Sequence, residues 1–265
     1  MSVLSNYTTA TRPSASSNTG LCIFNTDNGA IEVSDGTDYL TYLNDGGTFT
    51  SNTHSALFDG TNDYIDISGA SGLLNSATAL SISAWYYMDA LNAPIVSGGE
   101  SATDGCWIYN SASSNNLVFA VRNGDHTAIT TPVPSTGQWV HVAATYNAGS
   151  GTLYVTPLGG STTTVSSSTL PTSLSSTAGS NLSIGRLPPG VDSTYHNGKI
   201  DEVVIWNREI TSTEVSNIIN YKAYLNFSSM YRFENNADDE AGVNDGTNNG
   251  VTFAAKADDP ANTPY

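Results

Sequence analysis

Basic side chains are scarce in this sequence. Its 265 residues include 8 Lys and Arg against 24 Asp and Glu, which gives a formal net charge of −16. A chain of this charge repels phosphate backbones and anionic membrane surfaces. We therefore expect no nucleic-acid partner and no membrane insertion. Because only 12% of the residues are charged, solubility depends mainly on short neutral polar side chains, as in many extracellular and viral β proteins.

Long apolar runs and clustered cysteines are missing as well. No run approaches the ~18 residues of a membrane span. The opening MSVLSNYTTATRPSASSNTG has no apolar stretch after a basic start, so the sequence predicts no signal peptide and assembly in a cytoplasm. The 2 cysteines, Cys22 and Cys106, stand far apart, and the 4 histidines are scattered. This pattern predicts neither a disulfide framework nor a structural zinc site.

Short strands dominate what is present. In ALSISAWYYM, residues 79–88, alternation places one set of side chains on one face of a strand: Leu80, Ile82, Ala84, Tyr86 and Met88. Similar runs bounded by Gly, Asn, Asp, Ser or Pro recur along the chain, among them DYIDIS, GCWIYN, NLVFAVR, QWVHVAATYN and GTLYVT. Many short strands separated by turns predict a sandwich or jelly roll.

One segment has helical spacing instead. In ITSTEVSNIINYK the apolar residues Val215, Ile218 and Ile219 recur at the interval of a helix face. Thr211 and Glu214 stand at the spacing of a capping box, which satisfies backbone N–H groups at a helix start. The sequence therefore predicts one helix, over 212–222.

Three motifs between residues 55 and 222 resemble the laminin-G-like (LamG, concanavalin A-like) family. They are FDGTNDYI from Phe58, WVHVA from Trp139 and GKIDEVVIWNR from Gly198. The resemblance implies an all-β fold, a concanavalin A-like (LamG) jelly-roll sandwich with one short helix. A small N-terminal β-hairpin module would precede it.

The end of the chain looks like the beginning of such a domain. Members of this family usually open with a strand of the type Y-x-F-[ED]-x-N-A-x-D, a turn and G-x-x-F, whereas here YRFENNADDEAGVNDGTNNGVTF occupies residues 231–253. The tail should therefore fill the first-strand position of its own domain, or donate the strand to a neighbouring subunit. Both arrangements avoid an open sheet edge. The expected division is a hairpin module over 1–50, a jelly roll over 51–224 and a closing extension over 225–265.

Residues 10–45 resemble a short module of bacteriophage tail-fibre and virion proteins. The sequence itself predicts two strands, LCIFNT and AIEVSD, joined by an Asp-Asn-Gly turn. A hairpin this small needs a packing partner, so the module should help to attach or oligomerise the protein. Tyr39 stands where the module usually has Trp. The matching residues are Arg12, Pro13, Gly20, Phe24, Asn25, Thr26, Asp27, Ile31, Glu32, Asp35, Gly36, Thr37 and Tyr39.

Candidate ligand sites come mainly from the LamG resemblance. It implies Ca²⁺ in loops at one rim, and Asp59, Asp63 and Asp201 stand within the matching motifs. Oxygen ligands in flexible Gly/Asn loops suit this ion, and acidic turns without metal are the alternative. Glycan binding is often attached to the fold but is not fixed by it. The further candidates are Asp238 and Asp239 for Ca²⁺, and Trp107, Tyr109 and Tyr195 for glycan, with packing the favoured alternative for Trp107.

Catalytic patterns are not visible. Glycosidases of this fold place carboxylates alternately on one strand, as in E-x-D-x-x-E, and neither that run nor G-x-S-x-G occurs. We expect no enzyme, no catalytic residues and no cofactor beyond Ca²⁺. Packing or simple hydrogen bonding should explain the aromatic and imidazole side chains Trp85, Trp139, Trp206, His54, His126, His141 and His196.

Together these features predict a phage virion structural protein. It would be a fibre, knob or capsid decoration that displays an adhesive LamG-like domain, recognises host-surface glycans, and binds other virion proteins through the N-terminal module. A homotrimer is the expected assembly. The alternatives are a non-viral carbohydrate-binding module and, less favoured, a polysaccharide-degrading enzyme.

Overall fold

A computed structural model shows two compact units, each described by itself. The first comprises Met1–Ser51 and Ile210–Asn226, and the second Asn52–Glu209 and Phe227–Tyr265. The described residues are 5–25, 30–34, 37, 39–42, 52–91, 93–125, 127–188, 191, 193–221, 224 and 226–255. The segment 210–226 thus groups with the N-terminal residues, although residues 210–224 were predicted to belong to the jelly roll.

The first unit contains a four-stranded sheet in the order β1-β2-β3-β4. The predicted hairpin is present as β2 (Cys22–Asn25) and β3 (Ala30–Ser34), and β1 (Asn6–Tyr7) and β4 (Tyr39–Tyr42) extend it. These flanking strands were not predicted, because two to four residues without alternation give little signal. A 3₁₀ turn, η1, spans Ala15–Ser17.

Residues of the N-terminal motif form a buried polar centre in this unit. Arg12 Nη1 lies 2.8 Å from Glu32 Oε2, and Asn25 Nδ2 donates to Glu32 Oε1 at 2.8 Å. The Arg12 guanidinium also lies 5.0 Å from the Tyr39 ring centroid. These motif residues therefore stabilise the small sheet itself. Other predicted features lie outside the described residues: the turn at 27–29, Thr26, Asp35, Gly36 and His126.

The predicted helix is present as α2 (Ser212–Tyr221), and its capping box is formed. Glu214 Oε2 accepts a hydrogen bond from the Thr211 N–H at 2.8 Å, and Thr211 Oγ1 accepts one from the Glu214 N–H at 3.2 Å. The structure also has α1 (Ser71–Leu74), a single turn whose preceding residue makes no side-chain cap. A helix this short carries no periodic signal in sequence. None of the helices among the described residues is long and apolar enough to cross a membrane.

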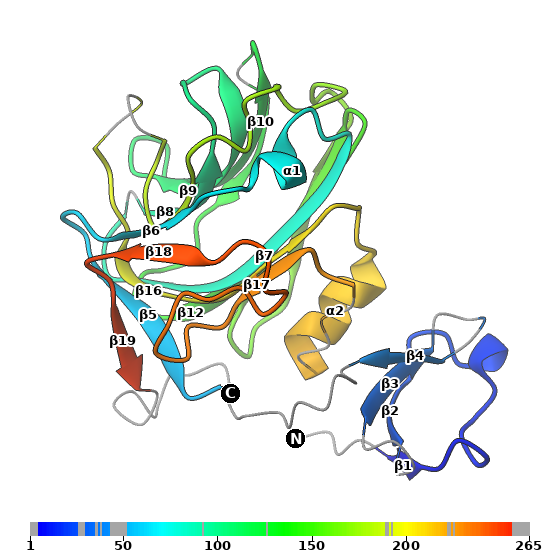
Figure 1. Ribbon diagram of the computed structural model, residues 1–265. Coiled ribbons are helices and arrows are strands. Elements are labelled where there is room, and N and C mark those ends of the chain that lie inside the picture. The colour runs from blue at the N-terminus through cyan, green and yellow to red at the C-terminus, as the bar shows by residue number, and fades with distance from the viewer. Residues whose placement is uncertain are drawn as a thin grey trace. The chain divides into compact units, whose positions relative to one another are not determined.

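The second unit is a sandwich of two sheets. The seven-stranded sheet has the order β11-β10-β9-β8-β15-β6-β18, and the eight-stranded sheet has the order β14-β13-β12-β7-β16-β5-β19, with β17 paired to β16 (Figure 1). The strand bounds are β5 His54–Asp59, β6 Tyr64–Ile67, β7 Ala79–Met88, β8 Pro94–Gly98, β9 Asp104–Ser111, β10 Asn116–Asn123, β11 Thr127–Pro132, β12 Trp139–Asn147, β13 Ser150–Pro157, β14 Thr163–Ser167, β15 Leu182–Ile184, β16 Asn197–Trp206, β17 Ser229–Tyr231, β18 Gly246–Asn249 and β19 Thr252–Ala255.

The core lies between the inner faces of these sheets. The predicted alternation of β7 is confirmed, because its five named residues are all buried in the main apolar cluster. Alternate residues of β6, β9, β10 and β15 enter the same cluster, among them Ile65, Ile108, Phe119 and Ile184. Successive strand side chains point to opposite faces, so the intervening residues of the seven-stranded sheet point away from the core. This outer face carries the candidate functional site.

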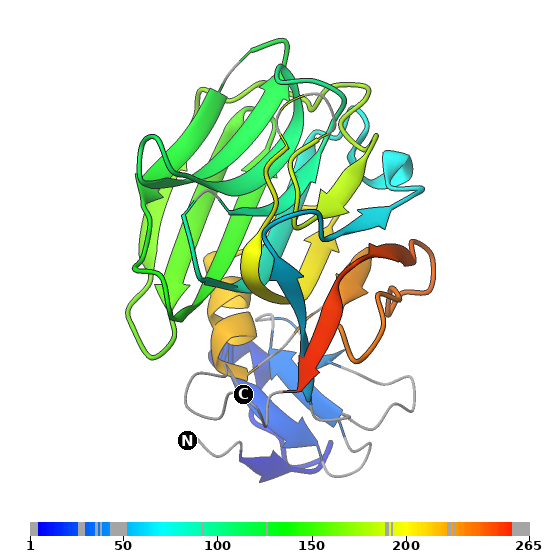
Figure 2. The same cartoon turned by 90° about the vertical axis from the view of Figure 1, so that its left-hand side faces the viewer.

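The tail completes both sheets within its own chain. β18 pairs antiparallel with β6, β19 pairs with β5, and β17 pairs with β16 beyond a β-bulge. Figures 1 and 2 show the red C-terminal strands beside the blue-to-cyan strands from the beginning of this unit. Asp239 fixes the loop between β17 and β18, since its carboxylate accepts hydrogen bonds from the N–H groups of Met230, Ala241 and Asn244.

Candidate functional site

Alternation on two neighbouring strands gathers polar and aromatic side chains on the outer face of the seven-stranded sheet. On β6, Ile65 and Ile67 are buried in the core, so Tyr64 and Asp66 project outward. On β15, Ser183 stands directly opposite Asp66. Arg186 and Tyr195, which follow β15 and pair with each other in an isolated β-bridge, lie beside them. We call Tyr64, Asp66, Ser183, Arg186 and Tyr195 the Arg186 cluster.

Arg186 lies at the centre of this cluster. Its Cζ is 3.7 Å from the centroid of the Tyr64 ring, and its Nη2 is 3.4 Å from Asp66 Oδ1. Its Nε donates to Ser183 Oγ at 3.0 Å. The Tyr195 ring lies 6.3 Å from that of Tyr64, centroid to centroid. Stacking and ion pairing therefore hold the guanidinium plane in one orientation.

Part of the hydrogen-bonding capacity of the cluster is unused. The Asp66 side chain is 39% exposed and that of Arg186 is 15% exposed. Within the described part of the chain, Asp66 Oδ2, Arg186 Nη1 and both tyrosine hydroxyls make no hydrogen bond. A carboxylate acceptor, a guanidinium donor and aromatic ring surface thus meet at one exposed place. This combination suits a ligand rich in hydroxyl groups.

The three predicted glycan-binding aromatics fall into two groups. Tyr195 belongs to the Arg186 cluster, whereas Trp107 and Tyr109 lie on β9 with a ring-centroid separation of 6.1 Å. Trp107 is only 2% exposed, and the guanidinium of Arg122 covers its ring at 3.8 Å. Leu187 belongs to the same buried apolar cluster as Trp107. Trp107 therefore offers no open ring face for a sugar, whereas Tyr109 and Tyr195 remain partly exposed.

The predicted calcium ligands are not all brought together. Asp63 Oδ2 accepts a hydrogen bond from the Asp59 N–H at 3.1 Å, so these two residues are neighbours. Asp59 pairs with Asn197 across the sheet, whereas Asp201 lies four residues further along β16 and is fully buried. Among the described residues no three His, Cys, Asp or Glu side chains group as metal ligands. The three carboxylates do not form one site, and calcium binding stays a prediction.

Both neighbouring carboxylates have local structural roles. Asp59 Oδ1 accepts a hydrogen bond from the Thr61 N–H at 2.7 Å, which stabilises the turn before β6. Burial raises the pKa of Asp63, the Asp59 N–H opposes this shift, and the charge of Asp59 adds to it. Gly250 packs directly against the Asp63 carboxylate. In the tail, Asp238 is exposed and accepts a hydrogen bond from Asn236 at 2.9 Å.

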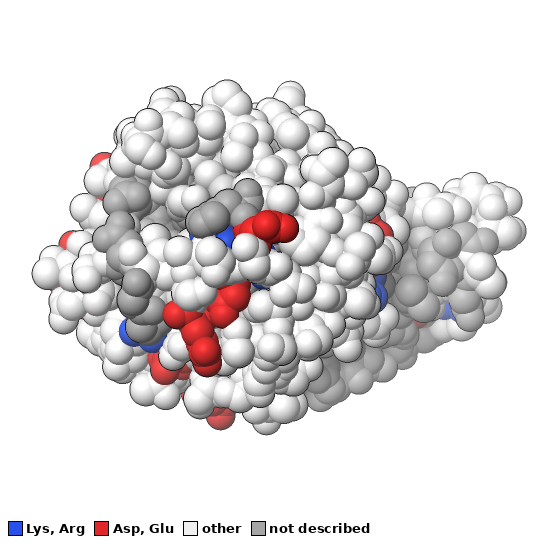
Figure 3. Space-filling view, turned by 90° about the horizontal axis from the view of Figure 1, so that it is seen from above, with Lys and Arg blue, Asp and Glu red and all other residues white. Residues whose placement is uncertain are grey.

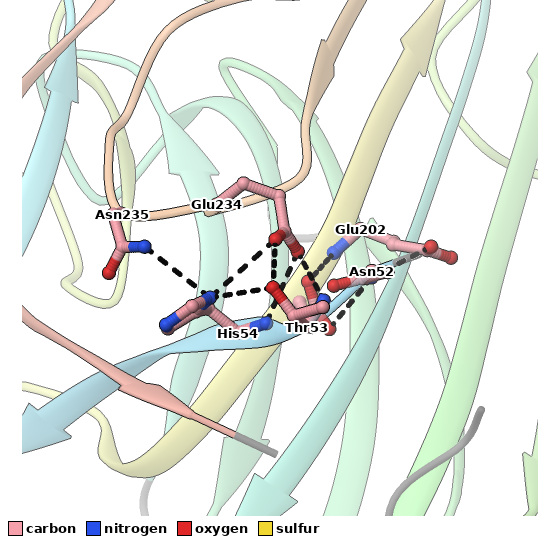
Figure 4. Close-up of polar contacts among 7 residues, drawn as sticks. Asn52, Thr53, His54, Glu202, Glu234 and Asn235 are labelled. Carbon is pink, nitrogen blue, oxygen red and sulfur yellow. Dashed lines mark hydrogen bonds and ion pairs between the residues drawn. The ribbon is translucent and has the colours of Figure 1, made fainter. Parts of the chain in front are cut away.

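A second polar cluster lies where β5 begins (Figure 4). The Glu234 carboxylate accepts hydrogen bonds from the N–H and the hydroxyl of Thr53, at 2.7 and 2.6 Å, and from the His54 N–H at 3.2 Å. Asn52 Nδ2 donates to Asp201 at 3.1 Å and to Glu202 at 2.9 Å. These contacts attach the tail and β16 to the first residues of β5.

Two further histidines are buried. His141 packs against Trp85, with a ring-centroid distance of 5.1 Å. His196 places Nδ1 3.0 Å from the Pro94 carbonyl oxygen and Nε2 3.1 Å from that of Tyr87. Burial lowers the pKa of His196 to about 4, against the opposing effect of these carbonyl groups. Packing and hydrogen bonding account for both side chains.

Sequence reasoning missed four members of the Arg186 cluster. Tyr64 was recognised only as a motif residue, and Asp66, Ser183 and Arg186 were not singled out as ligand-binding residues. The alternation of YIDI places Tyr64 and Asp66 on one face, which was the available signal. The pairing of β6 with β15, which brings Ser183 beside Asp66, joins segments far apart in the chain and cannot be read from local pattern.

Two antiparallel sheets packed on a shared core, with their polar site on an outer face, define a jelly-roll sandwich of the lectin type. Residues 59–216 match a laminin-G family profile described as the concanavalin A-like lectin/glucanases superfamily. The chain belongs to this superfamily. The predicted LamG-like fold is confirmed.

Solved structures support the same fold. A protein of Bacteroides ovatus, named as a candidate carbohydrate-binding protein, is 21% identical with a TM-score of 0.56, and the match covers 77% of this chain and 60% of that one. The heptameric SAP-like pentraxin of Limulus polyphemus is 17% identical with a TM-score of 0.55, covering 77% of this chain and 95% of that one. At these identities the likeness shows the fold alone. No curated protein matches the chain.

Proposed function

We propose that this protein is a non-enzymatic adhesive module that binds glycans on the outer face of its seven-stranded sheet and is displayed on a phage virion. The observation that supports glycan binding is the Arg186 cluster, where an exposed carboxylate, a stacked guanidinium and two phenol rings meet. Such groups recognise hydroxyl-rich ligands. The lectin superfamily and the name of the Bacteroides ovatus protein agree with it.

The placement of carboxylates supports a role without catalysis. Glycoside hydrolysis uses two carboxylates about 5 to 9.5 Å apart. The strands of the seven-stranded sheet carry Asp66 on β6 and Asp104 on β9, and two strands lie between these. Strand spacing alone separates them by about 14 Å. Asp104 also accepts hydrogen bonds from the N–H groups of Glu100 and Ser101, which fixes a loop.

The virion role is supported by the N-terminal motif, whose residues Arg12, Asn25, Glu32 and Tyr39 meet in the first unit. A small sheet of this kind suits attachment to other virion proteins and assembly as a homotrimer. A free carbohydrate-binding module is the second candidate, because the Arg186 cluster supports it equally. Glycan binding and attachment to particles therefore need separate measurements.

The test is co-sedimentation of the full chain with virus particles that lack it, alongside its mass in solution and binding to immobilised polysaccharides. We expect sedimentation with particles, a trimer mass, and retention on at least one polysaccharide. Arg12→Ala should weaken sedimentation and leave retention unchanged, because it disturbs only the first unit. Retention without sedimentation would replace the virion role by the free module. Sedimentation without retention would refute the proposed glycan binding. Release of reducing ends from a polysaccharide would refute the proposed non-enzymatic role.

A further inference from the structure

The free hydrogen-bonding groups of the Arg186 cluster differ in kind. Asp66 Oδ1 is already engaged by Ser183 and Arg186, whereas Oδ2 makes no hydrogen bond within the described residues. Arg186 uses Nε and one N–H of Nη2 on Ser183 and Asp66, which leaves both N–H donors of Nη1 and one of Nη2. An ionised carboxylate only accepts and a guanidinium only donates. The complementary ligand must therefore both donate and accept within a short span.

A pair of neighbouring hydroxyl groups meets this requirement. One hydroxyl donates to Asp66 Oδ2, and the oxygen of the next accepts from Arg186 Nη1. The bonds to Ser183 and the stack on Tyr64 hold both groups in place before a ligand arrives, which reduces the entropy lost on binding. The partly exposed Tyr195 ring, 6.3 Å from that of Tyr64, supplies apolar surface for the C–H groups of a sugar ring.

Charge selects against acidic sugars. Arg186 is already neutralised by Asp66 at 3.4 Å, so no unpaired cation is available for a sugar carboxylate or sulfate. The net charge of −16 adds long-range repulsion. Figure 3 shows a face on which uncharged residues predominate, with Asp and Glu gathered near its middle. An uncharged ligand avoids both penalties.

We propose that the Arg186 cluster binds uncharged glycans through a vicinal pair of free hydroxyl groups, Asp66 accepting from one and Arg186 donating to the other. This inference rests on the proposed glycan-binding function. It makes the carboxylate and the guanidinium the recognising groups, and gives Tyr195 the supporting contact. Trp107, covered by Arg122, takes no part.

The test is native affinity electrophoresis of the full chain in gels containing mannan, dextran or galactan as neutral polymers and alginate or polygalacturonate as acidic ones. Each neutral polymer is also used after periodate oxidation and borohydride reduction, which cleaves the bond between vicinal hydroxyl carbons and leaves the polymer uncharged. We expect retardation by at least one native neutral polymer, loss of retardation after oxidation, and none with acidic polymers.

Variants locate the binding. Asp66→Asn and Arg186→Lys should each weaken binding by about tenfold or more, since each removes a charge-assisted hydrogen bond. Tyr195→Ala leaves the ion pair intact and should weaken binding by severalfold, so it tests the site even if the other variants fold poorly. Thr130→Ala is the control. Thr130 is exposed on edge strand β11 opposite Val118, on the same face of the sheet, and its substitution should change nothing.

The outcomes separate the two proposals. Retardation by a neutral polymer that survives all three cluster substitutions, or survives periodate treatment, would overturn the vicinal-hydroxyl site and leave glycan binding standing. Retardation only by acidic polymers would do the same. No retardation by any polymer would overturn glycan binding itself, and the inference with it.

Discussion

Replacing Glu234 by Gln should loosen the attachment of the C-terminal tail to β5. The carboxylate accepts three hydrogen bonds from Thr53 and His54, at 2.6 to 3.2 Å. Gln keeps one acceptor oxygen for the two backbone N–H groups, but its amide nitrogen cannot accept the Thr53 hydroxyl proton. The negative charge is also lost.

The magnitude follows from these contacts. A hydrogen bond to a charged group contributes roughly 1.5–3 kcal/mol when buried, but the Glu234 side chain is 22% exposed, so solvent weakens each bond. We expect Glu234→Gln to cost about 1 kcal/mol of unfolding free energy, and Glu234→Ala about 2 kcal/mol because all three bonds are lost. For a unit of this size 1 kcal/mol corresponds to a fall in Tm of about 2–4 °C.

The loss of stability caused by Glu234→Gln should depend on pH. Burial alone would raise the pKa of Glu234, but the hydrogen bonds from Thr53 and His54 outweigh it and lower the pKa below its usual 4.5. A carboxyl group whose pKa is lower in the folded state stabilises that state above the unfolded pKa, and the stabilisation is lost as the pH falls through the folded value. The difference between wild type and Glu234→Gln should therefore be full at pH 7 and shrink below pH 4.5.

Urea unfolding at pH 7 and pH 3.5 measures this difference. Glu240→Gln, at an exposed position of the same tail, is the matched control and should behave as wild type at both values. A Glu234→Gln protein as stable as wild type at pH 7, or equally destabilised at both values, would refute the assignment of Glu234 as the charged attachment point.

Three further predictions concern stability. Gly198→Ala should lower the unfolding free energy by about 3 kcal/mol, seen as a lower Tm, because Gly198 has φ +137° and a Cβ there would collide with the Tyr87 carbonyl oxygen; an unchanged Tm would contradict this geometry. Thr211→Ala should cost about 1 kcal/mol by removing the capping box of α2, measured by urea unfolding, and Thr211→Ser should restore most of it. His196 has its pKa lowered to about 4, so the unfolded chain binds a proton that the folded chain does not between pH 6.5 and 4. As the pH is lowered through this range, the unfolding free energy should fall by about 1.4 kcal/mol per pH unit. An imidazole of His196 that titrates near pH 6.5 by NMR would contradict this prediction.

Local pattern predicted most strands of the sandwich, but it missed β8, β11 and β14. The run from Leu80 to Met88 alternates because one face of β7 is core, and Thr211 with Glu214 marks the helix start because those side chains satisfy its first N–H groups. Periodicity failed where an element is too short to show it, as in α1, β1 and β4.

The candidate site was harder to predict for a different reason. Arg186 stacks on Tyr64 although more than a hundred residues separate them, and their meeting depends on which strands become neighbours in the sheet. Trp107 shows the same dependence on neighbouring strands. Its Asn and Gly neighbours made it a candidate for glycan binding, with packing the favoured alternative, and Arg122 from the next strand covers its ring. The sequence around Trp107 does not predict this contact with Arg122.

Completion of the sandwich by the tail has a consequence for how the protein is made. Thr247 of β18 pairs with Asp66 of β6 across roughly 180 residues of chain, so these contacts form only after β18 has left the ribosome. Pairings of such long range are slow, because loop closure must precede any gain from contact. Until then the outer edges of β5 and β6 remain open and able to pair with other nascent chains. Folding yield should therefore depend on chaperone supply and on the rate of synthesis.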